Sequence, residues 1–99
     1  MRVIAKRTLK EFWEQGYDDA KTPLTEWYNM VLRASWETPQ QLKADIGTAS
    51  ILKGGRVVFN IGGNKYRVIL SIRYEQQIAW VRFVGTHAQY DKVNAETIL

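Results

Sequence analysis

An alternation of apolar and polar positions between residues 56 and 73 is the clearest pattern in the chain. In its second half, one side of an extended strand holds only large apolar residues: Tyr66, Val68, Leu70 and Ile72. The positions between them hold Arg67, Ile69, Ser71 and Arg73. A period of two is typical of a β-strand with one buried and one solvated face. The sequence therefore predicts a strand that turns one face to a core and leaves the other open.

Turn residues divide this region into three strands. Gly62-Gly63-Asn64 separates a strand at 56–61 from the strand at 66–73, and residues 75–77 separate the latter from an apolar run at 78–84. That last run is apolar on both faces apart from Arg82, so we expect it at the centre of the sheet. A short β-branched stretch at residues 2–5 predicts a further, first strand.

Helices are predicted by capping residues and by the spacing of apolar side chains. The longest is expected to begin at Thr22-Pro23 and to bury one wide face. That face is formed by Leu24, Trp27, Tyr28, Val31 and Leu32. Shorter helices are expected after three further threonines, each with Glu or Gln three positions later. These threonines are Thr8, Thr38 and Thr86.

The segments that remain lack a regular pattern. The helix after Thr38-Pro39 is expected to end near Asp45, residues 48–52 are expected to form a loop, and Gly54-Gly55 marks a turn. Residues 94–99 are expected to fray. The predicted class is α+β, in one domain over residues 1–99. An N-terminal strand and helices pack on one face of a small, mainly antiparallel sheet, and a short C-terminal helix follows.

Positive charge is concentrated on the predicted sheet. Residues 1–50 carry seven basic and seven acidic side chains, whereas residues 51–99 carry seven basic and three acidic ones. Such a distribution indicates a polyanionic partner, namely RNA, DNA or the ribosome. Scattered arginines and lysines on an ordinary basic protein are the alternative interpretation.

Composition excludes several other classes. The chain has no cysteine and one histidine, so we expect neither a disulfide, nor a metal site, nor a cofactor. No apolar run approaches the roughly 20 residues of a membrane span, and the first residues lack the apolar core of a signal peptide. We expect a soluble cytoplasmic protein with no membrane partner.

Two groups of residues are candidates for chemistry. Arg67, Arg73 and Arg82 are expected on the open face, where guanidinium groups suit phosphate oxygens; solubilising arginines are the alternative. His87 is expected in the first turn of the last helix, a position that favours anions and a neutral imidazole. Tyr90 and Asp91 follow on the same helix face, although a lone histidine at a helix start is more often structural.

These groups match what RNA cleavage requires. Attack of a ribose 2′-OH on the adjacent phosphate needs a base, a cation against the developing charge, and a proton donor for the leaving 5′-oxygen. His87, Tyr90 and a Lys or Arg from the sheet supply suitable groups, and the aromatic content offers surfaces for stacking bases. On the residues alone, ribonuclease is one of several interpretations.

Two longer motifs point to a family. FNIGGNKYR (residues 59–67) and RFVGTHAQYDKV (residues 82–93), with WETPQQLK (residues 36–43), resemble HigB-type toxins. These form a family of type II toxin–antitoxin systems in the RelE-like superfamily. The resemblance implies a growth-inhibiting mRNA interferase that cuts translated mRNA in the ribosomal A site. It also implies a cognate helix-turn-helix antitoxin, through which alone the toxin would reach operator DNA.

The resemblance also supports a set of site residues. We expect His87 as general base or acid, Arg67 and Arg73 as phosphate clamps, and Tyr90 as a substrate positioner. Lys65, or Lys53 in its place, is expected to move a proton or to stabilise charge. The remaining candidates for RNA contact are Asn64, Arg82, Asp91 and Lys92. A non-catalytic toxin, such as a gyrase poison, or a plain RNA- or ribosome-binding module is the alternative, because fold alone does not fix function.

Overall fold

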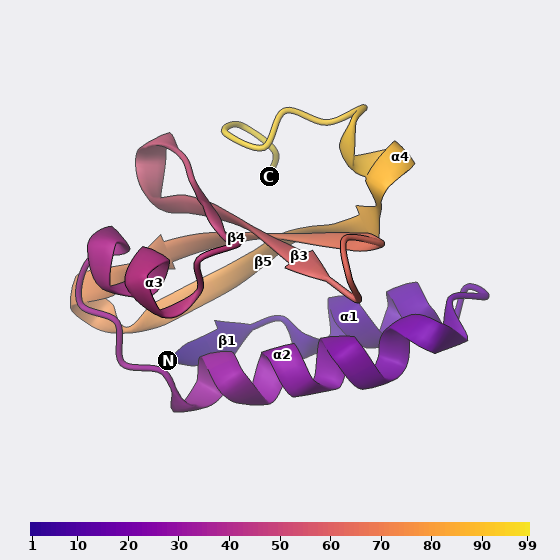
Figure 1. Cartoon of the computed structure of the whole chain (residues 1–99), viewed down its shortest axis with the longest axis horizontal. Helices are drawn as coiled ribbons and strands as arrows, with labels where there is room; N and C mark the ends of the chain where they lie inside the picture. The colour runs from indigo at the N-terminus through magenta and orange to yellow at the C-terminus, as the bar shows by residue number, and fades with distance from the viewer.

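A five-stranded sheet forms the centre of the molecule in the computed structural model, which describes residues 1–99 (Figure 1). The strands, in chain order, are β1 (Arg2–Ile4), β2 (Ser50–Ile51), β3 (Arg56–Ile61), β4 (Tyr66–Arg73) and β5 (Ile78–Thr86). Their order across the sheet is β1-β5-β4-β3-β2. β1 runs parallel to β5 and every other pair is antiparallel, which confirms the predicted mainly antiparallel sheet. β5 is an interior strand, although β4 holds the centre.

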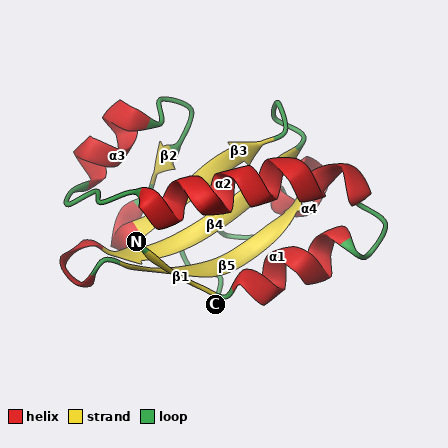
Figure 2. Ribbon diagram, turned by 90° about the horizontal axis from the view of Figure 1, so that it is seen from below, coloured by secondary structure: helices red, strands yellow, loops and turns green.

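Four helices accompany the sheet: α1 (Lys6–Trp13), α2 (Lys21–Arg33), α3 (Pro39–Asp45) and α4 (His87–Tyr90). Single 3₁₀ turns occur at η1 (Asp18–Ala20), η2 (Lys53–Gly55) and η3 (Tyr74–Gln76). α1 and α2 cross one face of the sheet (Figure 2), whereas α4 and the C-terminal residues lie on the other side (Figure 1). None of the helices combines the length and the apolar character that crossing a bilayer requires.

The main core lies between α1, α2 and the face of the sheet beneath them. The apolar side of β4 predicted from the alternation is buried there along its whole length. Leu9 and Phe12 of α1 and Leu24 and Val31 of α2 pack against it, and each is at most 5% exposed. The amphipathic spacing of α2 thus meets the period-two spacing of β4, as expected.

The other face of the sheet is covered around Val58 and Ile69 and is exposed at Arg73, which corrects the prediction of a face that is solvated throughout. Val58 and Ile69 lie on it and are buried beneath Ala95, with Tyr90 and Ile98 packed alongside. The Arg56 guanidinium donates to the carbonyls of Ala95, at 3.5 Å, and Ile98. Ala95 and Ile98 therefore hold the C-terminal segment against the sheet, whereas Leu99 at its end is 95% exposed. The sequence contained a signal for this burial: Val58 on β3 and Ile69 on β4 are apolar, although they occupy the positions expected to face solvent.

Helix starts follow local capping in two of four cases. Thr38 caps α3 by accepting from the Gln41 amide, and Thr86 caps α4 in a complete capping box with Gln89. The predicted starts of the other two helices were wrong. α1 begins two residues before Thr8, and α2 begins at Lys21 because η1 leads directly into it. The expected loop at 48–52 contains β2, whose two residues are too few to produce a pattern.

The covered second face can be tested with a matched pair of isoleucines. Ile69→Ala should lower the free energy of unfolding by about 2–4 kcal/mol, because Ile69 is fully buried beneath the C-terminal residues. Ile51→Ala removes the same atoms from a side chain that is 36% exposed and should cost less than about 1 kcal/mol. Urea denaturation measures the free energy of unfolding of both variants. Equal, small losses would show that this face is solvated.

Candidate active site

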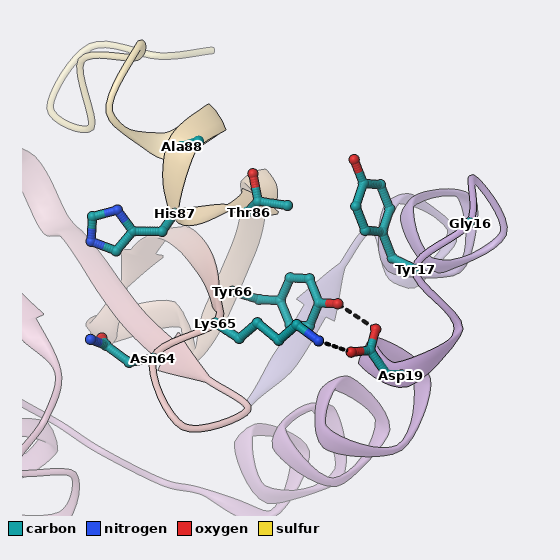
Figure 3. A pocket seen from close by; sticks show the side chains of 9 residues that line it. All are labelled: Gly16, Tyr17, Asp19, Asn64, Lys65, Tyr66, Thr86, His87 and Ala88. Atoms are coloured by element: carbon teal, nitrogen blue, oxygen red, sulfur yellow. Dashed lines mark hydrogen bonds and ion pairs between the residues drawn. The ribbon is translucent and has the colours of Figure 1, made fainter.

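A hollow of about 640 Å³ opens at the end of the sheet where β4 begins and β5 ends (Figure 3). Three segments far apart in the sequence form its walls. They are the turn after α1, the turn between β3 and β4, and the junction of β5 with α4. The lining residues are Gly16, Tyr17, Asp19, Asn64, Lys65, Tyr66, Thr86, His87 and Ala88.

The register of β4 against β5 brings two of these walls together. Tyr66 lies directly opposite Thr86 in the antiparallel pair. Lys65 immediately precedes Tyr66, and His87 immediately follows Thr86, so the pairing forces both onto the same end of the sheet. The predicted residues Asn64, Lys65 and His87 therefore share one hollow. In the sequence, 21 positions separate Lys65 from Thr86, the residue before His87.

Asp19 connects the helical layer to the sheet at this hollow. Its carboxylate accepts hydrogen bonds from the Lys65 ammonium and the Tyr66 hydroxyl (Figure 3). The Tyr66 ring is only 2% exposed and meets the Phe12 ring edge-on at 5.6 Å. Tyr17 stacks on Phe12, at 4.4 Å between centroids, and also meets the Tyr66 ring edge-on at 6.2 Å. A rigid aromatic group thus holds the Tyr66 hydroxyl against Asp19.

The three partners shift one another's protonation. The Lys65 ammonium, with the Tyr66 hydroxyl, lowers the pKa of the Asp19 carboxyl. The same carboxylate raises the pKa of Lys65. Burial first, and then Asp19, raises the pKa of Tyr66. At neutral pH the hollow therefore contains an ammonium, a carboxylate and a neutral phenol. Asp19 and Lys65 are both more than half exposed, so an incoming anion can displace the carboxylate at small cost.

His87 is the first residue of α4 and its side chain is 53% exposed. Its Nδ1 lies 3.2 Å from a carboxylate oxygen of Asp91, four residues on, as the helical spacing predicted. No other protein group bonds the imidazole. His87 and Asn64 lie on one side of the hollow and Tyr17 and Asp19 on the other, with Lys65 between them (Figure 3).

Arg67 does not face the hollow. Its guanidinium is buried and donates to the carbonyl oxygens of Asn64, at 2.9 Å, and Tyr66, at 3.3 Å. The group lies 5.8 Å from the centre of the Tyr90 ring. Arg67 thus ties the β3–β4 turn to α4. The structure places it as an internal brace of the site, not as an accessible phosphate clamp.

The remaining predicted cations lie elsewhere. Arg73 is six residues beyond Arg67 on β4, which separates their backbones by about 20 Å at ~3.3 Å per residue. Arg82 occupies a β-bulge and lies over the Trp80 ring at 5.7 Å. Lys53 is exposed in η2. The structure therefore separates Arg73, which was expected as a phosphate clamp, from the hollow. Lys92 is exposed just after α4.

Asp19, Tyr17 and the Tyr66 hydroxyl were not predicted. Tyr66 was assigned to the core by its alternation, and its ring is indeed buried there. Asp19 lies 46 positions before Lys65, and no local pattern connects them. No three His, Cys, Asp or Glu side chains are grouped so as to hold a metal ion. The hollow as built can bind an anion at Lys65 and transfer a proton at His87.

All the comparisons with known proteins point to the same family. A family model described as HigB_toxin, the RelE-like toxic component of a toxin-antitoxin system, matches residues 20–93. The chain is 33% identical over 93 residues to the mRNA interferase toxin HigB of Escherichia coli (strain K12), covering 92% of this chain and 88% of that protein. The mRNA interferase HigB of Shigella flexneri matches to the same extent. The mRNA interferase HigB of Escherichia coli O6:H1 is 26% identical over 95 residues, covering 94% of this chain and 91% of that protein.

The Asp19–Lys65 pair predicts a measurable titration. The Asp19 carboxyl should titrate below 3.8 in the wild-type protein, and Lys65→Gln should raise its pKa toward that value because the main cause of the shift is removed. Lys65→Arg keeps the cation and should keep the pKa low. NMR of the carboxyl carbon, followed against pH, measures the pKa of Asp19 in the wild type and in both variants.

The same pair fixes the sign of a pH effect on stability. A lowered carboxyl pKa stabilises the fold above the unfolded-state value, near 3.8, and the stabilisation is lost as the pH falls through the folded-state pKa. The stability difference between wild type and Lys65→Gln should therefore fade below pH 3.8. An Asp19 titration that is unaffected by Lys65→Gln would contradict the ion pair.

Proposed function

Because the chain belongs to the HigB family of RelE-like toxins, the toxic components of toxin–antitoxin systems, we propose that it is an endoribonuclease that cleaves mRNA. The relatives named mRNA interferase cover nearly the whole chain, which supports the same activity here. The observation that carries the proposal is the meeting of Lys65 and His87 in one hollow. A cation and an exposed imidazole at one site are what phosphodiester transfer requires.

The proposed reaction is an internal transesterification. The ribose 2′-oxygen attacks the adjacent phosphorus and loses its proton to a base. The bond from phosphorus to the 5′-oxygen of the next nucleotide breaks, and that oxygen takes up a proton. The products are a 2′,3′-cyclic phosphate on one fragment and a free 5′-hydroxyl on the other. The reaction draws its proton acceptor, proton donor and cation from side chains.

We assign the base to His87. Its imidazole is exposed and its Nδ1 lies 3.2 Å from an Asp91 carboxylate oxygen, so a proton gained from the 2′-OH leaves an imidazolium beside a carboxylate. The other ring nitrogen has no protein partner and is available to the substrate.

We assign charge stabilisation to Lys65. Asp19 raises the pKa of Lys65, so the group stays an ammonium at neutral pH and is unsuited to act as the base. When a phosphate enters, the ammonium can leave Asp19 for the phosphate oxygens and can donate a proton to the departing 5′-oxygen. Asp19 keeps the Lys65 side chain extended toward the hollow until then. We assign contacts with the flanking nucleotides to Asn64 and Tyr17, which line the hollow.

The cations outside the hollow fit a larger RNA. Arg73 lies at the far end of β4, too far from the hollow to touch the scissile phosphate, although its strand begins there. Arg82 lies on β5, opposite the middle of that strand. We assign these residues, with Lys53 and Lys92, to contacts with ribosomal RNA while mRNA in the A site occupies the hollow. Arg67 and Tyr90 then act as positioning residues. We further propose a cytoplasmic location and a helix-turn-helix antitoxin as the inhibitor, through which alone the toxin reaches operator DNA.

The imidazole assignment predicts the effect of one substitution. His87→Ala should lower the rate of mRNA cleavage by a factor of about 100 to 10,000, because a positioned general base is lost. Mapping of fragment ends after induction measures cleavage, and the wild-type fragments should carry 5′-hydroxyl and cyclic phosphate ends. Gln40→Ala, exposed on α3 and outside the hollow, should cleave like wild type. Full cleavage by a folded His87→Ala protein would refute the assignment. Growth arrest with DNA damage and no new mRNA ends would favour a gyrase poison.

The division of cations predicts a second, more selective effect. Arg73→Ala should reduce cleavage of mRNA on ribosomes by about tenfold while leaving cleavage of a short free oligoribonucleotide at its wild-type rate, whether that rate is high or low. Lys65→Ala should lower cleavage in both assays. Parallel assays with and without purified ribosomes measure the difference. A loss of the same size for Arg73→Ala in both assays would place Arg73 at the reacting phosphate.

A further inference from the structure

A second groove, of about 350 Å³, lies between α2 and β3 and shares no lining residue with the hollow. Trp27 and Met30 form its wall on α2, and Phe59, Asn60 and Ile61 form its wall on β3. The Trp27 ring meets the Phe59 ring edge-on at 5.3 Å. The groove is therefore a firmly built part of the fold, and the proposed reaction does not use it.

The strand that borders this groove has an unpaired edge. β2 pairs only with Val57 and Val58, so nothing pairs with the second half of β3 on that side (Figure 2). The Arg56 carbonyl accepts from the Leu52 amide, which shows that Arg56 turns its backbone groups toward β2. Backbone groups of alternate residues point the same way along a strand. Asn60 therefore turns its N–H and C=O outward, where no strand meets them.

Trp27, in the wall of the groove, has a buried donor without an acceptor. Trp27 is 6% exposed, and its indole nitrogen is fully buried with no hydrogen-bond partner in the chain. Native proteins rarely leave a buried donor unpaired. Because this N–H has no exposed surface, it does not itself select an occupant. The free strand edge in the other wall does, since a peptide main chain would satisfy it.

The charge of the groove distinguishes between an RNA and a polypeptide as its ligand. Glu26 is the only charged residue of the groove, although the chain as a whole carries a net charge of +4. A groove with one carboxylate and no cation repels an RNA backbone. It suits a segment of polypeptide with an apolar side chain for the space between Met30 and Phe59.

We infer that this groove binds an extended segment of the antitoxin, which adds to the sheet as a strand along the free half of β3. Main-chain bonds to Asn60 would supply affinity, and an apolar side chain of the segment would fill the space between Met30 and Phe59. The inference rests on the antitoxin partnership proposed above, and it is independent of RNA cleavage. The antitoxin would thus be held outside the hollow.

A matched pair of variants at Asn60 tests the strand addition. Asn60→Pro removes the outward N–H and places a ring on the edge, and edge strands tolerate proline. It should weaken binding of the purified cognate antitoxin, encoded beside the toxin gene, by about tenfold or more. Asn60→Ala keeps the N–H and should bind like wild type. Calorimetry measures both, with circular dichroism to confirm folding. Wild-type affinity in a folded Asn60→Pro protein would overturn the inference.

A second measurement uses the wild-type chain and does not depend on any variant folding. Complex formation should slow hydrogen exchange at the Asn60 amide by about tenfold or more and shift the Trp27 indole N–H signal in NMR spectra. An antitoxin complex in which both are unchanged would overturn the inference. So would the same protection produced by RNA alone, or by raising the concentration of the toxin alone. A wild-type toxin that fails to cleave mRNA would refute the proposed activity and leave this result unaffected.

Discussion

The antiparallel register between β4 and β5 is the constraint on which the rest of the structure depends. Pairing Tyr66 with Thr86 and Arg73 with Ile78 buries the apolar side of β4 beneath α1 and α2. It also sets the β3–β4 turn beside the first turn of α4. A slip of one residue would turn every side chain of the strand to the opposite face. The core and the proposed catalytic hollow are therefore specified by one set of backbone hydrogen bonds.

Elements with a long, regular pattern were predictable from the sequence. The eight residues of β4 and the apolar stripe of α2 each repeat a signal often enough to fix both type and face. The prediction of a solvated second face rested on Arg67 and Arg73 of β4. It was wrong because the apolar Ile69, which lies between them, is buried. Arg67 is buried against carbonyls and a Tyr90 ring, and Arg56 is buried against the C-terminal carbonyls. A guanidinium can be enclosed where backbone oxygens satisfy its donors, and sequence alone does not reveal those oxygens.

The proposed site was predictable in the parts that follow from strand pairing and helix spacing. Lys65 and His87 lie at the ends of paired strands, and Asp91 lies one helical turn after His87. Asp19 reaches the site only through the packing of the helical layer on the sheet, which no spacing rule gives. Arg73 was expected as a phosphate clamp because its charge was considered without its distance along the strand. It lies at the far end of β4, away from the hollow.

The walls of the hollow come from residues 16–19, 64–66 and 86–88, so no single stretch of chain contains the site. Cutting the chain anywhere between Asp19 and His87 and letting the pieces separate would dismantle it. A peptide copied from THAQYD would retain the imidazole and its carboxylate partner but would lack the ammonium. Any activity of this hollow is therefore a property of the intact fold, and separated fragments would lack it.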